Sequence, residues 1–227
     1  MRHSLVVSLA LLAIVRSPAV AQTCMGLASF STAPMQVTAN GQFGDLANTF
    51  GATVGYGIPS SVYGNLGVST TSYDGVDGST LGLGAHVGYQ MTVGKARQVQ
   101  VCPNASFGIG KGPNDDAAGI DQSSRSATVG LNVGTVLGAN PRMKIIPTAG
   151  LSYAHGKSKA EDDAGATLFE FSDSYGLAQL GVGIVLSQNI SVRPSVDIPL
   201  GLEGSDPTFG LTVGYNFGSR TAAHRRR

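Results

Sequence analysis

The sequence is short of charge and has no long apolar run after its first residues. Lys, Arg, Asp and Glu make up 13% of the 227 residues, against roughly 25% in ordinary soluble domains. The formal net charge is only +1, so composition gives no reason to expect a nucleic-acid partner. No later segment has the roughly 18 consecutive apolar residues of a membrane-spanning helix. These absences exclude a helical membrane protein and argue against nucleic-acid binding.

The first residues have the pattern of an export signal. A basic start is followed by the apolar segment Leu5–Val15 and by Ala19–Ala21, which matches a small-x-small cleavage site. The apolar segment is too short for a spanning helix, which needs ~20 residues. We therefore predict a signal peptide over residues 1–21 and a mature protein that begins near Gln22. If the source is a double-membraned bacterium, the mature protein lies in an oxidising compartment.

The segment Thr80–Met91, TLGLGAHVGYQM, alternates apolar residues with residues that are mostly glycine. Strict alternation predicts a β-strand, because successive side chains point to opposite faces. A half-buried soluble strand would carry charged and long polar side chains on its outer face, but here the second face is almost bare backbone. The chain holds 32 glycines. The same alternation recurs in four further segments: Phe50–Ile58, Ala127–Gly134, Ile190–Leu200 and Phe209–Phe217.

Weaker alternation completes a set of about ten predicted strands: Met35–Phe43, Val62–Tyr73, Arg97–Gly110, Met143–His155 and Tyr175–Ser187. Most are near the ~9 to 11 residues that a tilted strand needs to cross a bilayer. The apolar phase changes at Ala178 and Gln179, where we expect a β-bulge. Because backbone groups must be satisfied in hydrocarbon, we predict an all-β fold, a closed antiparallel transmembrane β-barrel over residues 35–217. Eight strands with a folded N-terminal segment would also fit.

The links between these strands alternate in length. Short links occur at Pro59–Ser61, Thr92–Ala96, Gly138–Arg142 and Gln188–Asn189. Longer links occur at Gly44–Thr49, Asp74–Ser79, Lys111–Ser124, Gly156–Ser174 and Glu203–Asp206. Long links in outer-membrane barrels face outward, and short turns face the periplasm. Under this assignment we predict that both termini lie on the periplasmic side. The acidic residues follow the same division, since every one except Asp197 falls in a long link.

Aromatic residues fall near both ends of the predicted strands. Near the inner ends lie Tyr56, Tyr89, Tyr215 and Phe217. Near the outer ends lie Phe43, Phe50, Tyr153 and Phe209. Two such rings are typical of the aromatic girdles that mark the two membrane interfaces.

With these features the chain resembles the small bacterial outer-membrane β-barrel proteins, a porin-like family. The last strand, FGLTVGYNF, is similar to the C-terminal assembly signal of that family, although here the chain continues as the basic tail 218–227. The resemblance implies a place in the bacterial cell outer membrane, with outer-membrane lipid, lipopolysaccharide and the barrel-assembly machinery as partners. We expect the tail to be a disordered periplasmic segment, or to bind anionic lipid or cell-wall polymer.

Few of the side chains predicted to face the lumen carry charge. The candidates are His86, Lys144, Arg193 and Asp197. Arg193 and Asp197 are four residues apart on one face, ~13 Å along a strand, so they cannot pair directly unless they lean toward each other. One interpretation is a structural charge network across the lumen, and the other is a constriction that selects solutes by charge.

The chain has two cysteines. Cys24 follows the predicted cleavage site, but the context AQTC does not favour lipidation. Cys102 is predicted to point inward near the periplasmic end of its strand. The periplasmic N-terminal segment 22–34 begins at the same end of the barrel. We predict a Cys24–Cys102 disulfide that holds Thr23–Pro34 as a partial plug, with two free thiols as the alternative.

Two functions remain open for such a barrel. The glycine-rich lumen favours a small channel for small polar solutes or ions, whereas a plug and short loops favour a non-conducting structural or surface-interaction barrel. A less favoured prediction is an outer-membrane lipid-modifying enzyme, with His155, Ser158 and Glu161 near the outer rim as nucleophile, base and orienting group. We expect no enzymatic activity, cofactor or metal site. A secreted soluble barrel would need a second layer to cover its apolar stripes, and the chain offers none.

Overall fold

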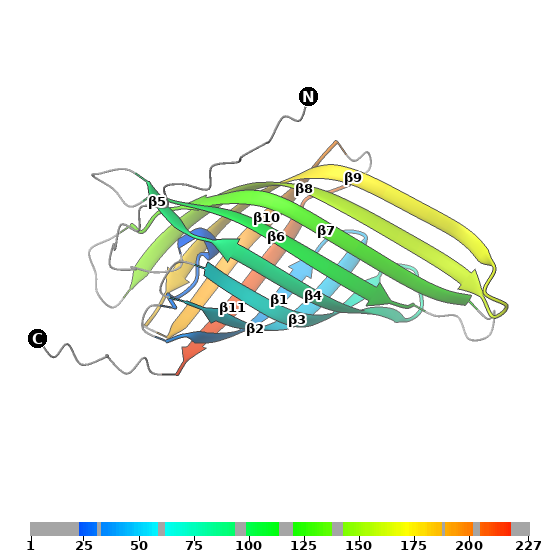
Figure 1. The fold of residues 1–227 in the computed structure, drawn as a ribbon, viewed down its shortest axis with the longest axis horizontal. Coiled ribbons are helices and arrows are strands. Elements are labelled where there is room, and N and C mark those ends of the chain that lie inside the picture. The colour runs from blue at the N-terminus through cyan, green and yellow to red at the C-terminus, as the bar shows by residue number, and fades with distance from the viewer. Residues whose placement is uncertain are drawn as a thin grey trace, which may run out of the picture.

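The computed structural model describes residues 23–30, 33–58, 62–93, 99–113, 120–137, 143–187, 189–201 and 205–218. They form one closed antiparallel barrel of ten strands (Figure 1). The predicted signal peptide and nearly all of the basic tail lie outside the described residues. Among the described residues, no helix is both long enough and apolar enough to span a membrane. The elements in chain order are η1 (Thr23–Met25), β1 (Met35–Phe43), β2 (Ala47–Gly57), β3 (Val62–Tyr73), β4 (Ser79–Tyr89), β5 (Met91–Val93), β6 (Val99–Lys111), β7 (Ile120–Gly134), β8 (Lys144–Asp162), β9 (Thr167–Val185), β10 (Ile190–Leu200) and β11 (Thr208–Phe217).

The barrel is closed by pairing between its first and last strands. β1 pairs with β11 from Met35 opposite Phe217 to Phe43 opposite Phe209. β4 and β5 are two segments of one strand, interrupted at Gln90, and both pair with β6. The eleven labelled strands therefore make a ring of ten, and no strand is left with a free edge along its whole length.

The distribution of side chains is the reverse of that in a soluble barrel. Large apolar side chains lie exposed on the outer surface; Leu66 is 68% exposed, Leu81 63% and Phe209 62%. The interior instead buries polar groups, including Gln36, Asn216 and Ser191. The side-chain period of two explains both faces, since each strand sends alternate residues outward to apolar surroundings and inward to the lumen. The aromatic side chains Tyr56, Tyr215, Phe43, Phe50 and Tyr153 also lie exposed on the outer surface.

The predicted long link Gly156–Ser174 is wrong. β8 continues to Asp162 and β9 begins at Thr167, so both strands are 19 residues long and only a tight turn joins them. Figure 1 shows this hairpin, with β7 beside it, projecting past the rest of the barrel. Polar residues are compatible with these strands because a span of ~9 to 11 residues already crosses the bilayer. The acidic residues Asp121, Glu161, Asp162, Glu170 and Asp173 therefore lie in strands, not links.

The predicted bulge at Ala178 and Gln179 is also wrong. β9 keeps one register with both β8 and β10 through this point, and the register shift lies instead between Ala160 and Glu161. Tyr175 and Leu177 share the inner face with Gln179. The apolar phase changes because Tyr175 and Leu177 are apolar residues on the inner face, not because the register shifts.

Candidate functional site

The first described residues fold into the barrel as a plug. We use "plug segment" for residues 23–30, 33 and 34, which lie at the end of the barrel where β1 begins and β11 ends (Figure 1). The structure joins Cys24 to Cys102 of β6 through a disulfide, with a Cα–Cα distance of 6.0 Å. Both cysteines are almost completely buried, at 1% and 0% exposure. The pair proposed from the sequence therefore forms the anchor of this segment.

The plug segment crosses the lumen from one wall to the opposite wall. The Asn216 side chain of β11 donates hydrogen bonds to the carbonyl oxygens of Ala28, at 3.3 Å, and Ser29, at 3.1 Å. The Ala28 amide donates to Ser191 Oγ of β10 at 3.3 Å. In the ring of strands, β6 and β11 lie on opposite sides. Between Cys24 and Ala28 the chain therefore spans the lumen.

Glycines of the barrel wall make room for the plug segment. A Cβ at Gly57 would overlap the ring of Phe30, and a Cβ at Gly183 would overlap the backbone of Gly26. On another side, Ala28 packs with Ile146 and Val185 in a small buried apolar cluster. At this end of the barrel the abundance of glycine in the lumen reflects close packing, not open space.

Beyond the plug segment, four side chains form a hydrogen-bonded network. Arg193 Nη2 donates to Gln179 Oε1 at 2.8 Å, and Gln179 Nε2 donates to Asp197 Oδ1 at 2.7 Å. Gln42 Nε2 donates to the other carboxylate oxygen of Asp197 at 3.1 Å. The network links β1, β9 and β10. Arg193 and Asp197 are thus coupled through an amide instead of a direct ion pair.

The network borders a polar cavity of about 240 Å³ inside the barrel. Met25 and Leu27 of the plug segment line it, together with Arg193, Gln179 and Asp197. His86 also lines the cavity, but its Nδ1 lies 3.5 Å from Asn65 Nδ2, apart from the network. Lys144 is not among the lining residues; it lies at the start of β8, two residues before Ile146, which packs against the plug segment. The cavity therefore brings together three of the four predicted lumen residues.

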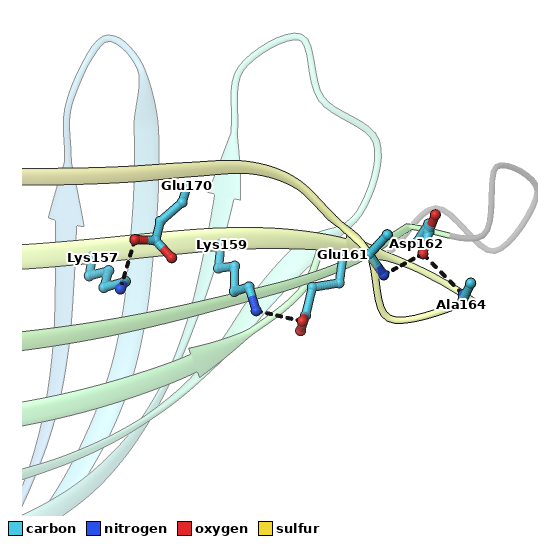
Figure 2. Close-up of polar contacts among 7 residues, drawn as sticks. Lys157, Lys159, Glu161, Asp162, Ala164 and Glu170 are labelled. Carbon is cyan, nitrogen blue, oxygen red and sulfur yellow. Dashed lines mark hydrogen bonds and ion pairs between the residues drawn. The ribbon is translucent and has the colours of Figure 1, made fainter.

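The projecting hairpin is a second candidate site, and Figure 2 shows its outer face. Lys157 Nζ lies 2.8 Å from Glu170 Oε1 across the hairpin, and Lys159 Nζ lies 2.5 Å from Glu161 Oε1. The hydrogen bond from Lys157 and its positive charge hold the pKa of Glu170 below its usual range. At the tip, Asp162 Oδ1 accepts hydrogen bonds from the amides of Ala164 and Ala166. These contacts order a hairpin that projects past the rest of the barrel with only β7 beside it.

One edge of this hairpin has no neighbouring strand. β9 pairs with β10 only as far as Gly176, opposite Leu200. From Thr167 to Tyr175, β9 pairs with β8 alone among the described residues. This free edge also carries exposed aromatic side chains, with Phe169 at 52% and Phe171 at 59% exposure. An edge of this kind presents unpaired backbone groups to any extended chain that approaches.

The residues predicted for an enzyme are not brought together. His155 and Ser158 are three residues apart on β8, so their side chains point to opposite faces of the strand. His155 Nδ1 lies 2.8 Å from Ser174 Oγ on the neighbouring strand, and Glu161 is engaged by Lys159. These residues do not form a nucleophile, base and orienting group. Among the described residues there is also no cluster of three His, Cys, Asp or Glu side chains that could hold a metal ion.

Comparison with known protein families matches residues 7–217 to the family described as outer membrane protein beta-barrel domain. The chain belongs to this family. The exposed apolar side chains of this outer membrane β-barrel accordingly face lipid, and the protein is an integral protein of the bacterial outer membrane. The prediction of a ten-stranded antiparallel barrel is confirmed.

Solved structures similar to this β-barrel include Ail, the attachment invasion locus protein of Yersinia pestis, at 16% identity and a TM-score of 0.40, covering 82% of this chain and 99% of Ail. The N-terminal β-barrel domain of Pseudomonas aeruginosa OprF has 14% identity and a TM-score of 0.32, with coverages of 82% and 98%. The β domain of the Bordetella autotransporter BrkA has 12% identity and a TM-score of 0.48, with coverages of 82% and 100%. A search of curated proteins gave no match.

Proposed function

We propose that the protein is a non-conducting surface-interaction barrel that binds an extended segment of another polypeptide at the free edge Thr167–Tyr175 of β9. The observation that carries this proposal is that β9 loses its neighbour β10 at Gly176 while its pairing with β8 continues to the tip. Strand addition to such an edge derives affinity from main-chain hydrogen bonds and specificity from alternate side chains. Phe169 and Phe171 offer exposed aromatic surface for that purpose.

The proposed orientation places the hairpin outside the cell and the plug segment on the periplasmic side. Outer-membrane barrels have short periplasmic turns and longer outer extensions, and β8 and β9 extend only at the hairpin end. With this orientation the free edge meets the surroundings of the cell. Lipopolysaccharide would surround the outer part of the barrel, and β11, which ends in Phe217, would carry the signal for the barrel-assembly machinery.

The plug segment across the lumen supports the non-conducting part of the proposal. The plug segment is held covalently at Cys102 and by hydrogen bonds at Asn216, on opposite walls. The network of Arg193, Gln179 and Asp197 then occupies the lumen beyond it. A small channel for polar solutes or ions is the second candidate, and the observation that favours it is the polar cavity of about 240 Å³. Conductance across planar bilayers separates the two.

A synthetic nine-residue strand peptide, rich in Thr, Val and Tyr and labelled with a fluorophore, tests strand addition. Its binding to the refolded protein is followed by fluorescence anisotropy, and amide hydrogen exchange reports protection of residues 167–175. Two controls sharpen the test. The same peptide N-methylated at alternate residues lacks the donors for a ladder, and a protein variant with Ser158–Phe171 replaced by Asn-Gly lacks residues 167–171 of the free edge.

We expect the peptide to protect the edge amides and to lose at least about tenfold in affinity in each control, because main-chain hydrogen bonds dominate this mode of binding. Equal binding of the N-methylated peptide would point to side-chain adhesion and contradict strand addition. Equal binding to the variant without the hairpin would place the site elsewhere on the protein.

A further inference from the structure

Between the polar cavity and the hairpin end of the barrel, the lumen wall is lined with small residues. A Cβ at Gly84 or at Gly156 would have no side chain within 4 Å. A Cβ at Gly108 would meet only one side chain, that of Ser126 on the neighbouring strand β7. Among the described residues, no side chain approaches these three glycines from across the lumen. The cavity is therefore accessible from the hairpin end, whereas the plug segment covers its other end.

The cavity wall carries polar side chains that have no partner in the protein. Asn40 of β1, Asn132 of β7 and Thr212 of β11 line the cavity. Within the part of the chain that the structure describes, none of these three side chains has a hydrogen bond to another residue. Asn40 and Asn132 belong to strands on opposite sides of the ring, so their amides reach the cavity from two directions. Each amide can both donate and accept hydrogen bonds.

The charged groups of the cavity are already engaged with amides. Each carboxylate oxygen of Asp197 accepts one hydrogen bond, from Gln179 or from Gln42, and Arg193 donates to Gln179. An anionic ligand in this space would be repelled by Asp197, and a cationic ligand would be repelled by Arg193. The groups that remain free donate and accept alike, as a hydroxyl group does. The wall therefore favours a ligand that is neutral and rich in hydroxyl groups.

We propose that the lumen cavity is a binding site for a small neutral polyol, of the size of one monosaccharide. Its volume of about 240 Å³ lies below the ~300 to 1,000 Å³ of pockets for drug-sized ligands, so it suits a single sugar ring. Met25 and Leu27 of the plug segment give the cavity an apolar floor, against which the C–H groups of a sugar can pack. Small-molecule sites combine such apolar surface with a few convergent polar groups.

This site is separate from the free edge of β9. The ligand enters and leaves at the hairpin end, because the plug segment lies across the lumen at the other end. The protein would thus hold the polyol without transporting it. Binding inside the lumen does not depend on the residues 158–171 of the hairpin, since none of them lines the cavity. Failure of this proposal would leave strand addition at β9 untouched, and the reverse also holds.

Saturation-transfer NMR on the refolded protein tests the proposal. The detergent is a zwitterionic one without a sugar headgroup, and the neutral probes are glucose, galactose and mannose. Glucuronate and glucosamine supply an anionic and a cationic probe of similar shape. Thr212→Val removes one hydroxyl from the cavity with little change of shape, and Asn132→Leu removes an amide. Asn48→Leu is the matched control, because Asn48 is exposed on β2 opposite the exposed Phe43.

We expect saturation transfer to at least one neutral hexose and weaker transfer to both charged sugars. Thr212→Val should weaken the affinity for that hexose by about threefold to tenfold, as the loss of one hydrogen bond predicts. Asn132→Leu should abolish the transfer, and Asn48→Leu should leave it unchanged. The heat-sensitive gel shift checks that each variant has a closed barrel, and Thr212→Val remains a test if Asn132→Leu fails to fold.

Three results would overturn the proposal. One is the absence of transfer to all three neutral hexoses in the wild-type protein. Another is equal affinity of the wild-type protein and Thr212→Val for the bound hexose, because the cavity would then not be the site. The third is stronger transfer to glucuronate or glucosamine than to the hexoses, which would assign the cavity to a charged ligand. The variant with Ser158–Phe171 replaced by Asn-Gly should keep the transfer, and its loss there would move the site from the lumen to the hairpin.

Discussion

Arg193 and Asp197 are coupled through the side-chain amide of Gln179. Its carbonyl oxygen accepts from Arg193 at 2.8 Å, and its NH₂ group donates to Asp197 at 2.7 Å. The two charges thus fix the orientation of the amide, since reversing it would place donor against donor and acceptor against acceptor. Gln179 comes from β9, so this contact also connects two neighbouring strands inside the barrel.

Removal of one charge from this network should cost more than removal of both. In Asp197→Asn, the Arg193 charge loses its compensation inside the barrel, and we expect the free energy of unfolding to fall by about 1 to 3 kcal/mol, less than for a dry buried pair because the lumen is polar. In Arg193→Gln with Asp197→Asn no uncompensated charge remains, so the double variant should be more stable than the sum of the single changes predicts. Urea unfolding in lipid vesicles measures this, and simple additivity would contradict the coupling.

The disulfide should hold the plug segment without being needed for barrel closure. Native protein should take up no maleimide label at Cys24 or Cys102, and denatured, reduced protein should take up label at both. In Cys24→Ser with Cys102→Ser, strand pairing is unchanged, so the heat-sensitive gel shift should remain. The plug segment should become more susceptible to protease because only hydrogen bonds and packing then hold it. Labelling of either cysteine in the native, unreduced protein would contradict the disulfide.

Bulk added at Gly183 should displace the plug segment. A side chain there would overlap the backbone of Gly26, which cannot move aside as a flexible side chain would. We expect wild-type protein to be silent in planar bilayers and Gly183→Val to give discrete conductance steps. Gly156→Val is the matched control, because a Cβ at Gly156 would have no atom within 4 Å. Conductance by the wild-type protein would favour the channel, and silence of Gly183→Val would show that closure does not depend on the plug segment.

The part of the barrel inside the membrane follows closely from the sequence. Lipid requires apolar side chains on the outer face, and the lumen accepts polar or small side chains on the inner face. Strands such as Ile190–Leu200 and Val62–Tyr73 therefore have the bounds that alternation predicts. The Cys24–Cys102 pairing also follows from a simple argument, since both residues were expected at the same end of the barrel. Gln179 was missed as a partner of the predicted charges. Its signal in the sequence is that it is a polar residue within an apolar segment.

The projecting hairpin could not be predicted in the same way. Residues 156–174 are rich in charge and small polar groups, a composition that is typical of loops. Their extended form depends on cross-strand pairs such as Lys159 opposite Glu170, which are visible only once the register is known. The misplaced bulge has another cause, because Tyr175 and Leu177 are apolar residues on the inner face and break the apolar alternation without any shift in register. Alternation of apolar residues predicts a strand only where lipid covers one face of that strand.

Excision of the hairpin should separate the interaction surface from the barrel. Replacing Ser158–Phe171 with Asn-Gly joins Lys157 to Ser172, which already lie opposite each other, by a turn suited to two antiparallel strands. The excised residues pair with one another and with the start of β7, and they contribute nothing to the pairing of β9 with β10. We therefore expect a normal gel shift and a change of about 1 kcal/mol or less in the free energy of unfolding.

The same variant should lose strand-peptide binding while its lumen stays closed, because the plug segment lies at the other end of the barrel. Peptide binding by fluorescence anisotropy and conductance in planar bilayers measure the two properties on one preparation. A variant that fails to fold would show that the hairpin is part of the stability core, against the register. A folded variant that still binds the peptide would remove residues 167–171 as the site.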